Sequence, residues 1–346
     1  MKKMLYLLAA PMLFASCDVH EFPELPEKEP FHLRLNYETD MTIWEHVYDG
    51  TTLKEVGFGA TYDNTQEYGS MRSIVRIYPS TEAMRSTRSH LEELVVNRNI
   101  RDGYDQEVTV EMPGGEYNVM VWSDITQLST QRPYYNADDF FEVMLQGDHI
   151  GNTDYRDAFR GKREYNFVVD VVQSDPDTLN ITMQRPLAKF EIISNDLKAF
   201  LDKEYKAMLE EAQSRGETPE SRVKAEDYKV MIFYSGYMPS AFNINTDKPV
   251  DSLLGVAFES QINVLNDDEA SIGFDYVFVN GTNSAVVVQV GIYNKDGKQI
   301  ALSNPITVPL RRSRHTVMRG SFLLQQASGG IVIIPEFNGN HNIVIQ

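Results

Sequence analysis

The chain is 346 residues long, contains 42% hydrophobic residues and carries a formal net charge of −18. A surface this acidic argues against a nucleic-acid partner and against electrostatic docking on anionic lipid. The chain has one cysteine, so no disulfide can form within it and its stability must come from packed cores. The length exceeds that of a typical single domain and predicts two.

The N-terminus has the pattern of a bacterial lipoprotein signal. Two lysines precede an apolar run at residues 4–14, which is shorter than the ~20 residues that a membrane-spanning helix needs. The tetrapeptide FASC at residues 14–17 resembles a lipobox, although a phenylalanine stands where a small or branched aliphatic residue is usual. We therefore expect residues 1–16 to be a signal peptide and Cys17 to carry an acyl lipid, such as palmitate, that tethers the protein outside the cytoplasm.

A spacer and a strand are predicted directly after this signal. Residues 17–30 hold prolines and glutamates in alternation with little to bury, which predicts an extended spacer between lipid and body. The body opens at residues 31–37, where apolar and polar side chains alternate with the period of a half-buried strand. The apolar positions of this strand are Phe31, Leu33, Leu35 and Tyr37.

Further strands and a helix are predicted in the first half. Strands are expected at residues 71–78, 106–111 and 116–122, and the Pro-Gly-Gly sequence at 113–115 predicts that the last two form a hairpin. The helical spacing of apolar residues over 81–96, with a threonine as N-cap, predicts a helix.

A second series of predicted strands begins near residue 180. Residues 179–193 are strand-like but contain Pro186, which is poorly tolerated in a central strand. We interpret this stretch as the last strand of one domain followed by the first strand of the next. A helix is predicted at 196–214, and a charged loop at 215–227.

The second half consists mostly of predicted strands. One strand is expected at 227–234, and three neighbouring antiparallel strands at 273–302, joined by hairpins at Asn-Gly 280–281 and Asp-Gly 296–297. The tail at 331–346 holds two short apolar strands. Many strands and few helices predict a mainly β fold, with two antiparallel β-sandwich domains in tandem.

Motifs for catalysis, a metal or a cofactor are not recognisable. The seven histidines include no short-spaced pair, and P-loop, dinucleotide and nucleophile-elbow motifs are absent. The acidic clusters at 138–139 and 267–269 lack the spacing of a calcium loop, so we interpret them as solvated loops. We therefore expect no enzyme activity, no metal and no cofactor, although sequence alone does not reveal carboxylates that meet across a fold.

Aromatic residues make up 11% of the chain and could line a carbohydrate platform. Trp44, Trp122 and the pair Tyr134-Tyr135 are the candidates. Trp122 belongs to an alternating strand and is expected in a core, whereas the loop at 133–135 is the better candidate for an exposed surface. Ordinary packing is the favoured interpretation for all of them.

Several stretches together resemble the FimB/Mfa2-like fimbrial-subunit lipoproteins of Bacteroidales. In chain order they are DVHEFP and FHLRLNY after the cysteine, PGGEYNVMVWSD, YRDAFRG at 155–161, RPLAKFEII at 185–193, YMPSAFN at 237–243 and RSRHTVMRGSFL at 312–323. The resemblance implies two transthyretin-like antiparallel β-sandwich domains, here at 31–183 and 184–346. It also implies a role in type V pili, whose subunits are exported as lipoproteins and joined by strand exchange.

We therefore expect an accessory subunit, anchor or tip, tethered to the outer membrane and associated with other fimbrial subunits by β-strand addition. The candidate strands are Phe31–Tyr37 and the tail, with Ile331, Ile333, Ile343 and Ile345 as its apolar positions. The first is expected to stay self-paired, because losing it would sever the body from its lipid. The tail is either self-paired or donated.

Two alternatives remain open at the level of sequence. The first is a surface lipoprotein that binds a glycan or a host ligand, as in a polysaccharide-uptake system. The second is a lipid-anchored hydrolase.

Overall fold

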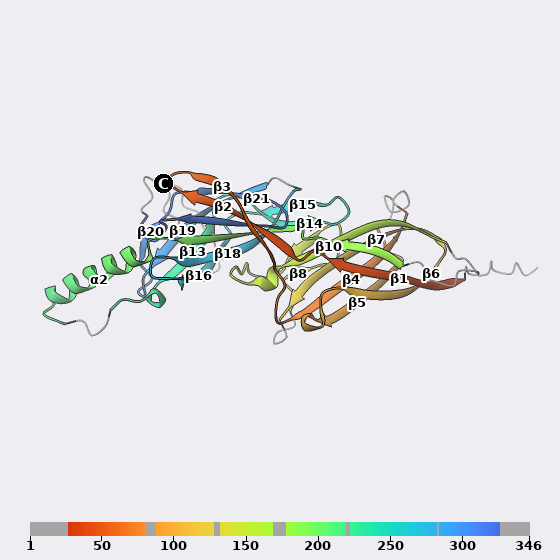
Figure 1. Cartoon of the computed structure of the whole chain (residues 1–346), viewed down its shortest axis with the longest axis horizontal. Helices are drawn as coiled ribbons and strands as arrows, with labels where there is room; N and C mark the ends of the chain where they lie inside the picture. The colour runs from red at the N-terminus through yellow and green to blue at the C-terminus, as the bar shows by residue number, and fades with distance from the viewer. Residues whose placement is uncertain are drawn as a thin grey trace, which may run out of the picture.

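The computed structural model describes residues 27–80, 88–127, 132–168, 178–218, 222–281 and 284–325. These residues are mainly β, which confirms that part of the fold class predicted from sequence. The sheets are mixed rather than purely antiparallel, because residues 32–37 pair in parallel with 178–183. The strands form two halves that lie end to end along the long axis, and helix α2 (Leu197–Ser214) projects from the far end (Figure 1). Cys17 and the tail at 331–346 lie outside the described residues.

Two sheets face each other in the first half. Their strand orders are β11-β1-β6 and β10-β7-β4-β5. Alternate side chains of each strand share a face, and the inward faces enclose an apolar core. The strands are β1 (Lys28–Tyr37), β4 (Ser70–Pro79), β5 (Glu92–Asn99), β6 (Gln106–Pro113), β7 (Gly115–Thr126), β10 (Ala158–Phe167) and β11 (Thr178–Met183).

Two larger sheets enclose a second core in the other half. One has the order β17-β18-β12-β22-β2-β3, and the other β16-β13-β19-β20, with β21 also paired to β19. The strands are β2 (Asp40–Tyr48), β3 (Leu53–Asp63), β12 (Leu187–Ser194), β13 (Lys229–Tyr234), β16 (Ala257–Gln261), β17 (Asn263–Val264), β18 (Ala270–Phe278), β19 (Ser284–Tyr293), β20 (Gln299–Leu302), β21 (Ile306–Leu310) and β22 (Arg314–Gly320).

The two halves are joined by shared sheets and a shared core. Strands β2 and β3 come early in the chain, yet β2 pairs in parallel with β22 near the end. A small sheet of order β15-β14-β9-β8 likewise combines strands from both halves. Between the halves, Trp122, Tyr135, Phe242 and Phe278 belong to one buried cluster. The added strands are β8 (Tyr135–Asn136), β9 (Val143–Leu145), β14 (Met238–Asn243) and β15 (Lys248–Leu253).

The break that was predicted at Pro186 is confirmed. Strand β11 ends at Met183 in a sheet of the first half, and β12 begins at Leu187 in a sheet of the second. The predicted helix at 196–214 is also confirmed as α2, which buries Leu197 and Phe200 against the second core.

Two predicted hairpins are wrong. Strands β6 and β7 flank the turn at 113–115 but lie in different sheets, because β6 pairs with β1 and β7 with β4 and β10. Strands β18 and β19, on either side of Asn280-Gly281, also lie in different sheets. Turn residues favour a reversal of the chain, but the strand after the turn can join the facing sheet instead of pairing with the strand before it. The hairpin at Asp296-Gly297 is confirmed, since β19 pairs with β20.

The predicted helix at 81–96 is wrong where the structure describes it. Residues 92–99 form β5, which pairs antiparallel with β4 from Ile77↔Glu92 to Ser70↔Asn99. The β-branched pair Val95-Val96 favours a strand, and pairing with β4 outweighs the helical spacing. Short 3-10 helices complete the described structure: η1 (Ile100–Asp102), η2 (Asp154–Arg156) and η3 (Ala225–Asp227).

Candidate functional site

Strand β1 fills a slot between two strands that do not pair with each other. It pairs in parallel with β11 from His32↔Thr178 to Tyr37↔Met183, and antiparallel with β6 from Lys28↔Pro113 to Leu35↔Gln106. It runs from the outer end of the first half toward the middle of the molecule (Figure 1). β1 is therefore the middle strand of its sheet, with a hydrogen-bonded neighbour along each of its own two edges.

The inward side chains of β1 hold it in this slot. Phe31, Leu33 and Leu35 are at most 1% exposed. The ring of Phe31 lies 4.9 Å from that of Phe167 and 5.5 Å from that of Tyr165. Burying three large apolar side chains removes a large apolar area from water, which strongly stabilises the strand in place.

Tyr37, the last residue of the strand, forms hydrogen bonds to the facing sheet. Its hydroxyl lies 2.9 Å from the Ser73 hydroxyl and 2.8 Å from that of Ser123, on two strands of the facing sheet. Burial raises the pKa of Tyr37 to about 12, against the weaker opposing effect of the two serine hydrogen bonds. The phenol therefore stays neutral and ties the two sheets together.

The outward face of β1 is polar. Arg34 Nε donates to Glu107 Oε1 at 3.0 Å, and His32 Nδ1 lies 2.9 Å from Thr109 Oγ1. These exposed contacts fix the register with β6 but contribute little free energy. All four predicted strand-exchange positions of β1 therefore face the core, whereas the tail positions lie outside the described residues.

The junction between the halves contains a fully buried ion pair. Arg185 Nη2 lies 2.8 Å from Asp157 Oδ2, and both side chains are 0% exposed. The guanidinium of Arg185 also lies 4.7 Å from the Phe159 ring centroid and donates to the carbonyl oxygens of Glu38 and Asp40, each at 3.2 Å. This arginine therefore fixes the crossover from β1 to β2.

A second buried group surrounds Asp275. It pairs with Arg156, and it accepts hydrogen bonds from His149 Nε2 at 2.7 Å and from the Tyr234 hydroxyl at 2.6 Å. Burial alone would raise the pKa of Asp275, but Arg156 and His149 outweigh burial and lower it. The carboxylate therefore stays ionised and links the loop at 149–156 to β18.

A third group lies around Asp247. Arg160 Nε and Arg312 Nη1 each lie 2.6 Å from its carboxylate oxygens. One arginine belongs to β10 of the first half and the other follows β21 in the second. Asp247 therefore bridges the two halves with three charge-assisted hydrogen bonds, two from Arg160 and one from Arg312.

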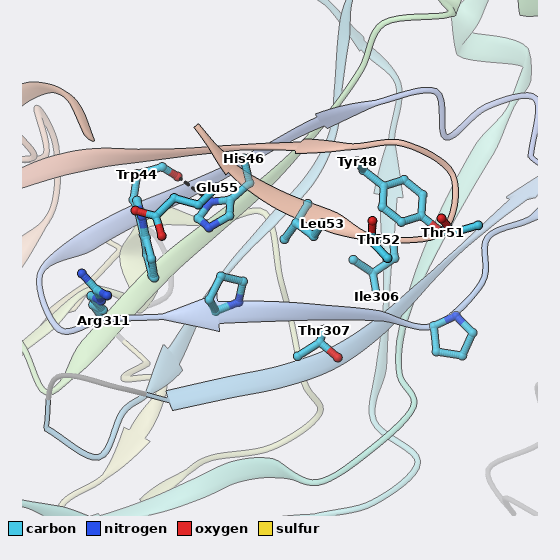
Figure 2. A pocket seen from close by; sticks show the side chains of 12 residues that line it. Trp44, His46, Tyr48, Thr51, Thr52, Leu53, Glu55, Ile306, Thr307 and Arg311 are labelled. Carbon is cyan, nitrogen blue, oxygen red and sulfur yellow. Dashed lines mark hydrogen bonds between the residues drawn. The ribbon is translucent and has the colours of Figure 1, made fainter. Parts of the chain in front are cut away.

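A pocket of about 530 Å³ opens between the β2–β3 hairpin and β21. Figure 2 shows Trp44 and Arg311 at one end, Tyr48 and Thr51 at the other, and His46 between them. The guanidinium carbon of Arg311 lies 4.2 Å from the Trp44 ring centroid. Burial lowers the pKa of His46, so its imidazole is neutral at physiological pH.

The aromatic candidates lie in different places. Trp122 is fully buried, as predicted. The prediction of an exposed surface is wrong for Tyr135, which lies in β8 with 0% exposure, because its hydroxyl donates to the Arg156 carbonyl at 2.6 Å and its ring packs on Trp122. Trp44 is 4% exposed and lines the pocket.

The described residues contain no group of three or more His, Cys, Asp or Glu side chains that could hold a metal ion. In the same residues, no helix is long and apolar enough to cross a membrane.

Sequence reasoning missed the buried ionic groups. Asp157 and Arg156 belong to the YRDAFRG stretch, Arg185 to RPLAKFEII and Arg312 to RSRHTVMRGSFL. The available signal was charged residues directly beside apolar strands, because a charge that becomes buried there is tolerated only with a partner. Their partners Asp247 and Asp275 lie far away in the chain and carried no signal.

Solved structures of fimbrial proteins are similar to this chain. The fimbrial anchor protein Mfa2 from Porphyromonas gingivalis is 9% identical, with 79% of this chain and 82% of that chain covered and a TM-score of 0.37. The tip fimbrial protein Mfa3 from the same organism, with a C-terminal truncation, is 12% identical, with coverage of 84% and 94% and a TM-score of 0.39. A fimbrial assembly protein from Parabacteroides distasonis is 12% identical, with coverage of 85% and 91% and a TM-score of 0.37.

These structures belong to the group of Bacteroidales fimbrial proteins that the sequence motifs resemble. No curated protein matches the sequence. The profile of a family of unknown function, DUF6562, matches residues 26–346, which is nearly the whole chain and all of the described structure. The chain therefore belongs to this family.

Proposed function

We propose that the protein is a structural accessory subunit, anchor or tip, of a type V fimbria. Cys17 carries its lipid and tethers it to the outer membrane, and it associates with other subunits by β-strand addition. Its body consists of two transthyretin-like sandwiches, 31–183 and 184–346, with the β2–β3 hairpin contributed to the second. The sequence motifs and the packing of the chain support this proposal.

The observation that carries the proposal is the place of β1. A shaft subunit must vacate its slot for a neighbour's strand, whereas an anchored subunit must keep its own strand there. Here β1 is paired on both edges and its inward side chains are buried. Tension from the lipid would load β1 along its length, so that many hydrogen bonds must shear together before it leaves.

Strand addition needs an extended donor and a free edge. Residues 331–346 supply two short apolar runs, with Ile331, Ile333, Ile343 and Ile345 as the proposed anchors. Main-chain hydrogen bonds to an edge give affinity, and alternate side chains give specificity. We propose that this segment is donated to a neighbouring subunit.

The test uses two variants in cells that assemble the fimbria. Cys17→Ser should move the protein from the membrane fraction to the soluble fraction. Deletion of residues 331–346 should leave it on the membrane but abolish its co-purification with other fimbrial subunits. Membrane retention of Cys17→Ser would contradict the tether, and intact co-purification after the deletion would contradict donation by the tail. A surface lipoprotein that only binds glycan would retain its glycan after the deletion.

A further inference from the structure

The pocket beside β21 has a composition that strand pairing does not require. Its lining combines two aromatic rings, Trp44 and Tyr48, with the hydroxyls of Thr51 and Thr307 and the carboxylate of Glu55. Its volume of about 530 Å³ lies within the range of small-molecule sites, ~300–1,000 Å³. The rings are largely buried, so the hydroxyls and the carboxylate beside them are the groups that suit a small ligand with many hydroxyls.

The walls of this pocket are poor templates for an added strand. Strand β21 contains Pro309, which has no N–H to donate, and its carbonyl already accepts a hydrogen bond from Thr316 Oγ1 at 2.8 Å. Opposite it, β3 pairs with β2 through two register shifts, which bend the edge. A compact ligand therefore fits these walls better than an extended peptide.

Arg311 gives the pocket an unmatched positive charge. The neighbouring Arg312 pairs with Asp247 at 2.6 Å, but Arg311 forms no ion pair with any residue that the structure describes. Its Nε is buried without a hydrogen-bond partner, and so is Nε1 of Trp44, which is 4% exposed. A buried donor left unsatisfied costs ~1–3 kcal/mol.

We propose that this pocket binds a saccharide that carries a carboxylate group. The carboxylate accepts hydrogen bonds from the terminal guanidinium nitrogens of Arg311, which form no ion pair with the residues that the structure describes. Arginine is suited to this role because its planar fork matches a carboxylate. The sugar hydroxyls face Glu55 and Thr307.

A hexuronic acid and a sialic acid share this chemistry, because each presents one carboxylate on a hydroxylated ring. A neutral hexose lacks the group that pairs with Arg311. The discrimination between acidic and neutral sugars should therefore depend on this one side chain. The saccharide site goes beyond the fimbrial role and does not depend on it, since neither Cys17 nor the tail takes part.

Binding to the full chain is measured by calorimetry with three probes: methyl glucuronide, the methyl glycoside of N-acetylneuraminic acid, and methyl glucoside. We expect at least one acidic probe to bind ~10-fold or more tightly than methyl glucoside, because a hydrogen bond to a charged group contributes ~1.5–3 kcal/mol. The better acidic probe then identifies the source of the carboxylate.

Two arginine variants separate the pocket from the rest of the surface. Arg311→Gln should reduce acidic-probe binding to the level of methyl glucoside, and Arg311→Lys should give an intermediate loss. Arg101→Gln is the matched control, since Arg101 also stacks on an aromatic ring, 4.5 Å from the Tyr68 centroid, but far from the pocket. It should bind like the wild type.

The proposal is overturned if acidic and neutral probes bind equally, or if none binds. It is also overturned if Arg101→Gln loses as much affinity as Arg311→Gln, or if a synthetic peptide of residues 331–346 saturates the pocket and excludes the acidic probes. Unchanged thermal unfolding of Arg311→Lys shows that its loss of affinity is local.

Discussion

Replacing Leu35 with alanine tests whether β1 is held in its slot by side-chain burial. Leu35 is 0% exposed, lies opposite Gln106 on β6 and Ile181 on β11, and packs in the core of the first half. A buried Leu→Ala change costs ~2–5 kcal/mol, because the lost transfer free energy is joined by the cost of the cavity. We expect ~3 kcal/mol here, since paired strands on both sides limit collapse of the cavity.

The matched control is Arg34→Ala, one residue earlier on the same strand. Arg34 points outward, its side chain is 51% exposed, and its partner Glu107 is 70% exposed. An exposed ion pair of this kind contributes ~0–1 kcal/mol. The two neighbouring substitutions should therefore differ by ~2 kcal/mol or more, which corresponds to at least a ~30-fold difference in the unfolding constant.

The assay is urea unfolding of the full chain followed by tryptophan fluorescence, combined with hydrogen exchange of β6 and β11. Trp122 lies in β7 of the first half and reports on it. Loosening β1 should speed exchange at the edges of β6 and β11 that it covers. A Leu35→Ala variant that is no less stable than Arg34→Ala would refute the idea that burial holds β1.

Three further predictions concern packing and charge. A Cβ at Gly161 would lie 2.5 Å from Ile181 Cγ2, so Gly161→Ala should lower the free energy of unfolding by ~1–3 kcal/mol, measured by thermal unfolding. Gly236→Ala is the control and should have a far smaller effect, because its Cβ would come no closer than 3.8 Å to Val287. Asp275→Asn should cost ~3–5 kcal/mol at pH 7, because it leaves Arg156 buried without its counter-charge. The folded pKa of Asp275 is below its unfolded value of 3.8, so the stabilisation by its carboxylate is present above pH 3.8 and is lost as the pH falls through the folded pKa. Between pH 4 and 2, the thermal midpoint of the variant should therefore fall less than that of the wild type. Equal falls would contradict this prediction. Tyr37→Phe should lower the free energy of unfolding by ~1–2 kcal/mol, because the Ser73 and Ser123 hydroxyls lose a buried partner, and a neutral effect in urea unfolding would contradict it.

Local sequence patterns predicted where strands and turns lie more reliably than which strands pair with each other. The alternation from Phe31 to Tyr37 predicted β1, and Pro186 correctly marked the change from one half to the other. The turn sequences at 113–115 and 280–281 predicted reversals of the chain, but not whether the next strand stays in the same sheet. That choice depends on long-range pairing, which the identity of the turn residues does not encode.

The pocket could not be predicted, because its two walls are distant in the chain. Trp44 was a candidate by residue type alone, and Arg311 stood at the start of a run of charged and polar residues, 311–316, with nothing to single it out. The unmet hydrogen-bonding capacity of both side chains became visible only when β2 and β21 were placed opposite each other. Sequence indicates which groups a chain has, whereas folding decides which of them lack a partner.

Charged residues of the motifs hold the two halves together. Arg185 pairs with Asp157, Arg156 with Asp275, and both Arg160 and Arg312 with Asp247. Arg185–Asp157 and Arg156–Asp275 are buried, and breaking either pair would leave an uncompensated charge, so rotation of one half against the other would be opposed most at these two places. A subunit that joins a membrane tether at one end to a fimbria at the other must resist this motion. Three of the stretches that resemble fimbrial lipoproteins, at 155–161, 185–193 and 312–323, therefore supply arginines to the junction that would carry the load under the proposed function.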